Sequence, residues 1–181
     1  MINNKYPRRR SIRLEGFDYS QPGAYFITAV TLNRACMFET IFVDQVNLNP
    51  IGRLVESEWQ RLEQRFSHIQ LGSWIVMPNH IHGIIHLIQS EIVQQPFENA
   101  DLLKPLEQFG SPIPGYIPTI IRSFKSSVTQ QHQNLYRDYS TKIWQRNYYD
   151  HIIRGESDLE NIHDYILDNP RKWTEDENFS R

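Results

Sequence analysis

The sequence is poor in cysteine, since its 181 residues contain a single one, Cys36. One thiol excludes both a disulfide framework and a cysteine-rich zinc site, and such scarcity is typical of a reducing compartment. The N-terminal residues also lack an apolar segment as long as that of a signal peptide. We therefore expect a cytoplasmic protein.

Charged side chains are absent from residues 67–90, a run long enough to span a membrane. The run nevertheless contains Pro78, Asn79, Gly72, Gly83 and four histidines, which a lipid-facing helix does not tolerate. We therefore expect buried sheet in this region and no contact of the protein with a membrane.

A strong net charge is also missing, because the formal value is −2 at pH 7. The charges are unevenly placed: residues 1–13 carry five bases and no acid, residues 116–154 six bases and two acids, and residues 155–181 eight acids and three bases. Such a distribution can create a basic face that binds nucleic acid. A solvated arm and ordinary helix surfaces would give the same pattern, so composition leaves both interpretations open.

The first half of the chain shows clear periodicities. β-Branched and aromatic residues predict a strand at 24–32, and apolar residues three and four apart predict a helix at 49–66, capped near Asn49. Strands predicted at 70–78 and 80–88 are separated by the turn Pro78-Asn79, which favours a hairpin. The length and the apolar fraction of 39 % suit one domain with a full-sized core.

The second half predicts a helix at 118–133, a strand at 142–154 and a final helix. Ser157 and Glu160 fit the capping-box pattern at the start of that helix, and Pro170 disfavours its continuation. The complete order is β-α-β-β-α-β-α. It predicts an α+β fold, a ferredoxin-like antiparallel sheet with helices on one face, plus a C-terminal helix.

Two histidines stand one residue apart in "MPNHIHGII". In a strand, His80 and His82 point to the same side and Ile81 to the other, so both imidazoles can share one divalent ion. Two hydrogen-bonded histidines beside a turn are the alternative. A histidine-triad hydrolase would need a third histidine at position 84, where the chain has Ile84.

A tyrosine in the predicted C-terminal helix offers a nucleophile. Tyr165 and Asn169 are four residues apart, so they lie on one helix face, one turn from each other. A tyrosine beside a metal ion can attack a phosphodiester, although its pKa of about 10 calls for a nearby base. Tyr148 and Tyr149 remain alternatives if the helix is misassigned.

Four segments, in this order, closely resemble the HUH single-tyrosine transposases, and in particular the REP-associated tyrosine transposase branch. They are "MPNHIHGII", "IIRSFKS", "WQRNYYDHIIR" and "DYILDNPRKW". The resemblance covers roughly residues 20–173. Together with the composition of the rest of the chain, this predicts a basic arm at 1–19, a catalytic domain at 20–173 and a polar tail at 174–181. Residues 91–115, rich in proline and without clean periodicity, are expected to form a loop insertion in the catalytic domain.

The resemblance also implies a chemistry. Similar enzymes bind Mg²⁺ or Mn²⁺ through two histidines and a polar residue of the tyrosine helix, here His80, His82 and Asn169; some relatives use glutamine at the last position. The nucleophile, here Tyr165, attacks single-stranded DNA, forming a 5′-phosphotyrosine link and releasing a 3′-hydroxyl. The substrates of such proteins are hairpins, often REP-like palindromes.

Basic residues are the candidate DNA contacts, because arginine forks suit phosphates and base edges. The candidates are Arg8, Arg9, Arg10, Arg13, Arg122, Lys125, Arg146 and Arg154. Bound to DNA, the protein would be found at the nucleoid, as a monomer or as a homodimer that exchanges the tyrosine helix. The alternative function is a catalytically silent protein that binds hairpin DNA in a regulatory or host role.

Overall fold

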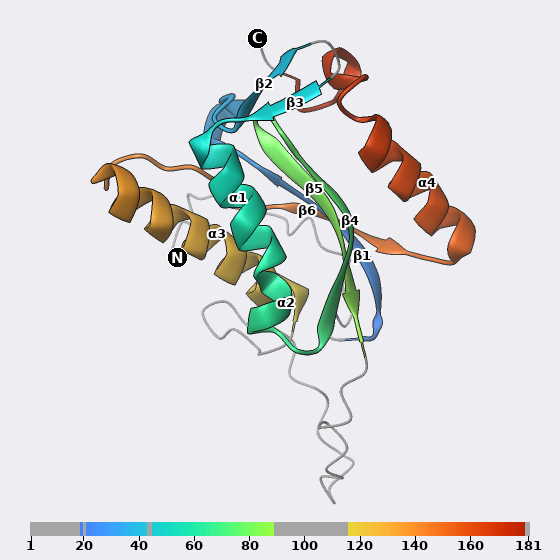
Figure 1. The fold of residues 1–181 in the computed structure, drawn as a ribbon. Coiled ribbons are helices and arrows are strands. Elements are labelled where there is room, and N and C mark those ends of the chain that lie inside the picture. Colours follow the sequence, from blue (N-terminus) through green and yellow to red (C-terminus); the bar gives the residue numbers. More distant parts are fainter. Residues whose placement is uncertain (1–18, 20, 43–44, 89–115, 180–181) are drawn as a thin grey trace, which may run out of the picture.

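A four-stranded antiparallel sheet forms the centre of the molecule (Figure 1). The computed structural model describes residues 19, 21–42, 45–88 and 116–179. The strand order is β4-β5-β1-β6, with bounds β1 Gly23–Val30, β4 Ile69–Met77, β5 His80–Leu87 and β6 Tyr149–Ile153. This order is that of the ferredoxin-like sheet, so the predicted fold class is confirmed.

Helices cover both faces of the sheet. One face carries α1 (Pro50–Gln60), α2 (Leu62–Arg65) and α3 (Ile117–Tyr136), and the other carries α4 (Glu156–Asp168), as Figure 1 shows. The main core lies under α1 and α3 and includes Ile81 and Ile85 of β5. A smaller core beneath α4 contains Ile84 and Ile166. No helix in the described ranges is long and apolar enough to cross a membrane.

The predicted helix at 49–66 is interrupted at Arg61, where α1 gives way to α2. Its predicted cap is confirmed, because the Asn49 side-chain oxygen accepts hydrogen bonds from the amides of Ile51 and Gly52, both at 2.9 Å. A short hairpin of β2 (Glu39–Phe42) and β3 (Gln45–Leu48) precedes α1 and was not predicted. Strands of four residues are too short to show a period.

The predicted strand at 142–154 is wrong in its first part, because β6 begins at Tyr149. Before it, the chain makes only an isolated bridge between Thr31 and Trp144. The ammonium group of Lys125 donates hydrogen bonds to the carbonyl oxygens of residues 145, 146 and 147, at 2.6, 3.3 and 3.1 Å. A side chain therefore satisfies backbone groups that a strand would pair with its neighbour.

The predicted capping box at the start of α4 is also wrong, because the helix begins at Glu156 and Ser157 lies inside it. Gly155 is the N-cap and has a φ of 91°, which glycine adopts without strain. The carboxylate of Asp158 accepts a hydrogen bond from the Arg154 amide at 2.8 Å and contacts His151 at 3.0 Å. These contacts lower the pKa of Asp158 and connect β6 to the first turn of α4.

Gly83 allows α1 to approach the sheet. A side chain at this position would point into the main core, and a Cβ added there would lie 2.3 Å from Cζ2 of the Trp59 ring. Trp59 is fully buried and packs edge-to-face on Phe124, with ring centroids 5.2 Å apart. A side chain at position 83 therefore has no space unless the indole moves.

We predict that Gly83→Ala lowers the free energy of unfolding by about 1–3 kcal/mol through overpacking. Urea unfolding followed by circular dichroism measures the loss. Trp59→Phe makes space at the same point, so Gly83→Ala combined with Trp59→Phe should be less unstable than the sum of the two single variants. Additive losses would contradict the contact.

Candidate active site

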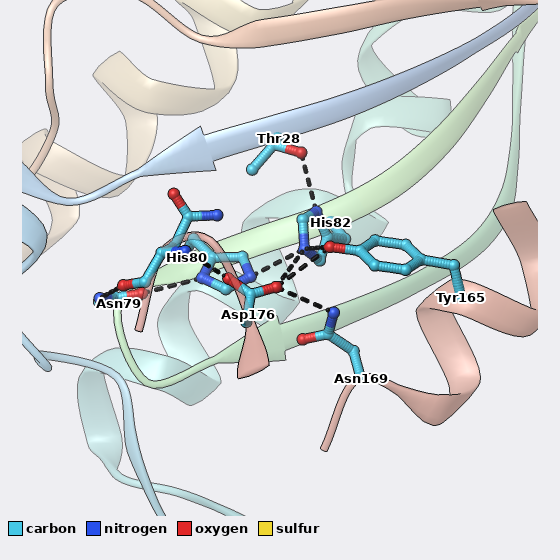
Figure 2. Close-up of polar contacts among 8 residues, drawn as sticks. Thr28, Asn79, His80, His82, Tyr165, Asn169 and Asp176 are labelled. Carbon is cyan, nitrogen blue, oxygen red and sulfur yellow. Dashed lines mark hydrogen bonds and ion pairs between the residues drawn. The ribbon is translucent and has the colours of Figure 1, made fainter. Parts of the chain in front are cut away.

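The hairpin of β4 and β5 presents His80 and His82 to the α4 face of the sheet. Both side chains are buried, with exposed fractions of 0 % and 2 %. Their Nε2 atoms are 2.9 Å apart (Figure 2). This separation is a hydrogen-bond distance between the two rings, and it would also let both nitrogens bind one divalent ion at ~2.1 Å from each.

The other ring nitrogens of the two histidines are held by neighbouring polar groups. Nδ1 of His80 lies 2.8 Å from Oδ1 of Asn79, whose amide nitrogen donates to the carbonyls of Arg34 and Asn178 at 3.0 and 2.8 Å. The Asn79 oxygen therefore accepts from His80, which leaves Nε2 of the neutral ring unprotonated. Nδ1 of His82 is 2.8 Å from Oγ1 of Thr28. Metal-binding histidines are usually oriented in this way.

The histidines are electrically suited to bind a cation. Burial lowers the pKa of His80 well below its ordinary value, and the neighbouring His82 lowers it further. Burial also lowers the pKa of His82, although Asp176 opposes the shift. Both rings are therefore neutral near pH 7, the form in which imidazole binds metal ions.

Asp176 is a candidate site residue that the sequence did not reveal. Its buried carboxylate lies 3.7 Å from Nε2 of His82, and ligand atoms of His80, His82 and Asp176 all lie within 4.8 Å of one another. Burial raises the pKa of Asp176, but the interaction with His82 and a 2.6 Å hydrogen bond from the Asn178 amide outweigh it and keep the group ionised. Nothing in its spacing distinguishes it from the other acids at the C-terminus.

Tyr165 points from α4 into the histidine pair (Figure 2). Its hydroxyl lies 3.3 Å from Nε2 of His82 and donates a hydrogen bond to Oδ2 of Asp176 at 3.1 Å. The ring packs edge-to-face on Phe26, which stacks on His82. The residue is 42 % exposed, so a substrate can reach it. Burial and the Asp176 charge raise the pKa of Tyr165.

Asn169 lies one turn after Tyr165, as the C-cap of α4. Its amide nitrogen donates to Oδ2 of Asp176 at 3.2 Å, whereas its oxygen Oδ1 is buried without a hydrogen-bond partner among the described residues. A buried acceptor without a partner is costly unless a ligand satisfies it. Imidazole nitrogens, an amide oxygen and a carboxylate together fit a divalent ion such as Mg²⁺ or Mn²⁺.

The structure thus brings together His80, His82, Tyr165 and Asn169, and it does not bring the four predicted DNA contacts that it describes to them. Arg122 and Lys125 belong to α3, on the opposite face of the sheet, and Lys125 is engaged with backbone carbonyls. Arg146 and Arg154 are exposed around β6. Arg8, Arg9, Arg10 and Arg13 lie outside the described residues.

The two alternative tyrosines lie further from the histidines. Tyr148 packs against the main core on the opposite face of the sheet. Tyr149 is 54 % exposed on β6, opposite Thr28 in the strand register, and its ring contacts Phe26 edge-to-face. The hydroxyl of Tyr165, by contrast, lies within hydrogen-bond distance of His82.

No family model matches the chain. An uncharacterized protein of Haemophilus influenzae is 37 % identical over 172 residues, covering 93 % of this chain and 92 % of that protein. A putative REP-associated tyrosine transposase of the same organism is 23 % identical over 156 residues, covering 86 % and 74 %. A solved REP-associated tyrosine transposase bound to a REP hairpin has the same fold, with a TM-score of 0.59, 18 % identity and coverage of 89 % and 74 %. The resemblance expected from the sequence segments is confirmed.

We predict that Thr28→Val weakens Mn²⁺ binding about 10–100-fold, because the hydroxyl that orients His82 is lost while the shape of the side chain is kept. Isothermal titration calorimetry measures the affinity. Thr129→Val is the matched control, since its hydroxyl donates a hydrogen bond to the Lys125 carbonyl within α3, on the opposite face of the sheet from the site. Equal affinities for the two variants would show that Thr28 does not orient the ligand.

Proposed function

We propose that this chain, which belongs to a family of REP-associated tyrosine transposase-like proteins, cuts and rejoins single-stranded DNA through a covalent tyrosine link. The observation that carries the proposal is the position of the Tyr165 hydroxyl, 3.3 Å from Nε2 of His82 and within a hydrogen bond of Asp176. A nucleophile, two buried neutral imidazoles and a buried carboxylate converge on one point, and the Tyr165 side chain that carries the nucleophile is partly exposed. A protein that only bound DNA would have no need of this arrangement.

Hairpin DNA is the proposed substrate. The solved transposase of the same fold binds a REP hairpin, and two of the segments that carry the resemblance, those containing His80 and Tyr165, form the candidate site of this chain. The exposed position of Tyr165 suits a flexible single strand, which can place its phosphate against the ring more easily than a duplex can. We therefore expect cleavage in the unpaired DNA at the foot of a hairpin.

The ion would be held by His80, His82 and the oxygen of Asn169, which has no other partner in the described structure. A bound Mg²⁺ or Mn²⁺ supplies Lewis-acid chemistry, polarising the phosphate and stabilising its developing charge. Thr28 and Asn79 keep the two imidazoles turned toward the ion. Phe26 fixes the ring of Tyr165 relative to His82.

Tyr165 performs the attack. Its oxygen forms a bond to phosphorus, the bond from phosphorus to the 3′-oxygen breaks, and the departing 3′-oxygen takes up a proton from water. The products are a 5′-phosphotyrosine and a 3′-hydroxyl. The raised pKa of Tyr165 keeps the phenol protonated in the free protein, so the proton must leave as the new bond forms. The Asp176 carboxylate already accepts the hydrogen bond of the hydroxyl and is placed to receive that proton. Attack by a 3′-hydroxyl reverses the step and rejoins the strands.

We predict that a labelled hairpin with single-stranded flanks, incubated with the full chain and Mn²⁺, forms an adduct that survives denaturing electrophoresis. Tyr165→Phe should reduce the adduct below detection, because the nucleophilic oxygen is absent. Tyr149→Phe is the matched control and should retain it. EDTA and His80→Ala should also abolish the adduct, since both remove the ion.

Other results of this experiment would indicate a different nucleophile or a different function. An adduct lost in Tyr149→Phe and kept in Tyr165→Phe would place the nucleophile on β6. Tight binding of hairpins without an adduct, across flanks of varied sequence, would overturn the enzyme in favour of a catalytically silent hairpin-binding protein.

A further inference from the structure

A groove of about 520 Å³ lies beside α4, on the same face of the sheet as the histidine pair. The sheet contributes Gly72, Ser73 and His86 to its lining, and the helix contributes Glu160, His163 and Asp164. Its volume lies within the usual range for small-ligand sites, about 300–1,000 Å³. None of the site residues described above lines it.

The groove is produced by a β-bulge in β4. Leu71 pairs with Ile85 and Trp74 pairs with Gly83, so two residues, Gly72 and Ser73, stand opposite the single residue Ile84. Leu71 and Trp74 both pack toward the main core, which leaves the two extra positions for the α4 side. Bulges of this kind are frequent next to active sites, where they redirect a side chain.

Glycine at position 72 keeps the floor of the groove open. A Cβ added to Gly72 would lie 3.0 Å from Nε2 of His86 and 3.0 Å from Cβ of Ile84. Across the groove, the Ser73 hydroxyl is hydrogen-bonded to Nδ1 of His163. Ser73 of the bulge thus holds the His163 ring through Nδ1. The other ring nitrogen, Nε2, is the one that can face a ligand.

The lining favours a nucleobase over a phosphate. Two carboxylates, Glu160 and Asp164, repel a phosphate but accept hydrogen bonds from the amino group of a base. Imidazole rings offer faces on which a base can stack, and Ile84 and Leu159 add apolar surface. The groove lining contains no lysine or arginine.

The groove lies within reach of DNA attacked by Tyr165. His82 and His86 are on the same face of β5, four residues apart, which corresponds to about 13 Å at ~3.3 Å per residue. At the duplex rise of ~3.4 Å per nucleotide, that distance is covered by about four nucleotides, and by fewer in an extended strand.

We propose that the groove between the β4 bulge and α4 binds one unpaired base bearing an amino group, within about four nucleotides of the cleaved phosphate. The proposal rests on the proposed function, because it takes its ligand from the DNA brought to Tyr165. It makes the groove a sequence-reading subsite: the carboxylates select cytosine, adenine or guanine over thymine at one position of the flank.

The experiment uses a set of hairpins in which the bases of the single-stranded flank are removed one position at a time. Fluorescence anisotropy is measured with the full chain in EDTA, so that neither the ion nor the covalent step affects the result. Binding should fall about 5–100-fold when the base is missing at one position, and less at the others. Thymine at that position should bind more weakly than cytosine.

Two variants assign this effect to the groove. Gly72→Ala fills its floor and should remove the difference between intact and abasic DNA at that position. Glu160→Gln removes a carboxylate and should reduce the preference for cytosine over thymine, whereas Glu156→Gln, an exposed α4 position outside the groove, should not. If Gly72→Ala does not fold, Glu160→Gln and its control decide.

The outcomes separate this proposal from the chemistry of the site. The base subsite is overturned if no single abasic position weakens DNA binding more than the others. It is also overturned if both variants still show the position-specific loss of binding. Either result holds even if the tyrosine adduct forms. A position-specific loss that the variants remove supports the subsite even if no adduct forms, in which case the proposed cleavage fails alone. Absence of any hairpin binding overturns both.

Discussion

Strand β5 is buried on both faces, and the rest of the structure depends on this constraint. Its alternation sends Ile81 and Ile85 into the main core and His80 and His82 toward α4. A shift of one residue in its pairing would place imidazoles in the apolar core and isoleucines in the polar site. The packing of Trp59 on Gly83 and the hydrogen bond of Thr28 to His82 fix the register from opposite faces. The packing of the core and the orientation of the site therefore depend on the same strand register.

Asn79 connects the hairpin turn with two distant segments. Its amide nitrogen binds the carbonyls of Arg34 and Asn178, and its oxygen binds the ring of His80. The segment after α4 is thereby held over the histidines, and Asp176 comes to lie beside Tyr165. One side chain consequently couples the orientation of a candidate ligand to the placement of a candidate proton acceptor.

The sequence predicts those parts of the molecule that depend on the spacing of residues within a single strand or helix. The alternation of β5 and the four-residue spacing of Tyr165 and Asn169 place side chains on faces without knowledge of their partners. Asp176 depends instead on the turn after α4 and on the contact between Asn178 and Asn79, 99 residues apart in the chain. The segment before β6 was misassigned for a similar reason, because the ammonium of Lys125 replaces a strand partner there. The predicted capping box is wrong because Gly155, two residues before Ser157, is the N-cap of the helix.

The two cores differ greatly in size. Among the described residues, nineteen buried side chains form the core under α1 and α3, whereas four form the core under α4. Ile166 is the only buried side chain that α4 itself contributes. Elements with few buried apolar contacts open at lower free energy than the whole domain unfolds. We therefore expect α4, the helix that carries Tyr165, to open at lower free energy than the sheet and its main core unfold.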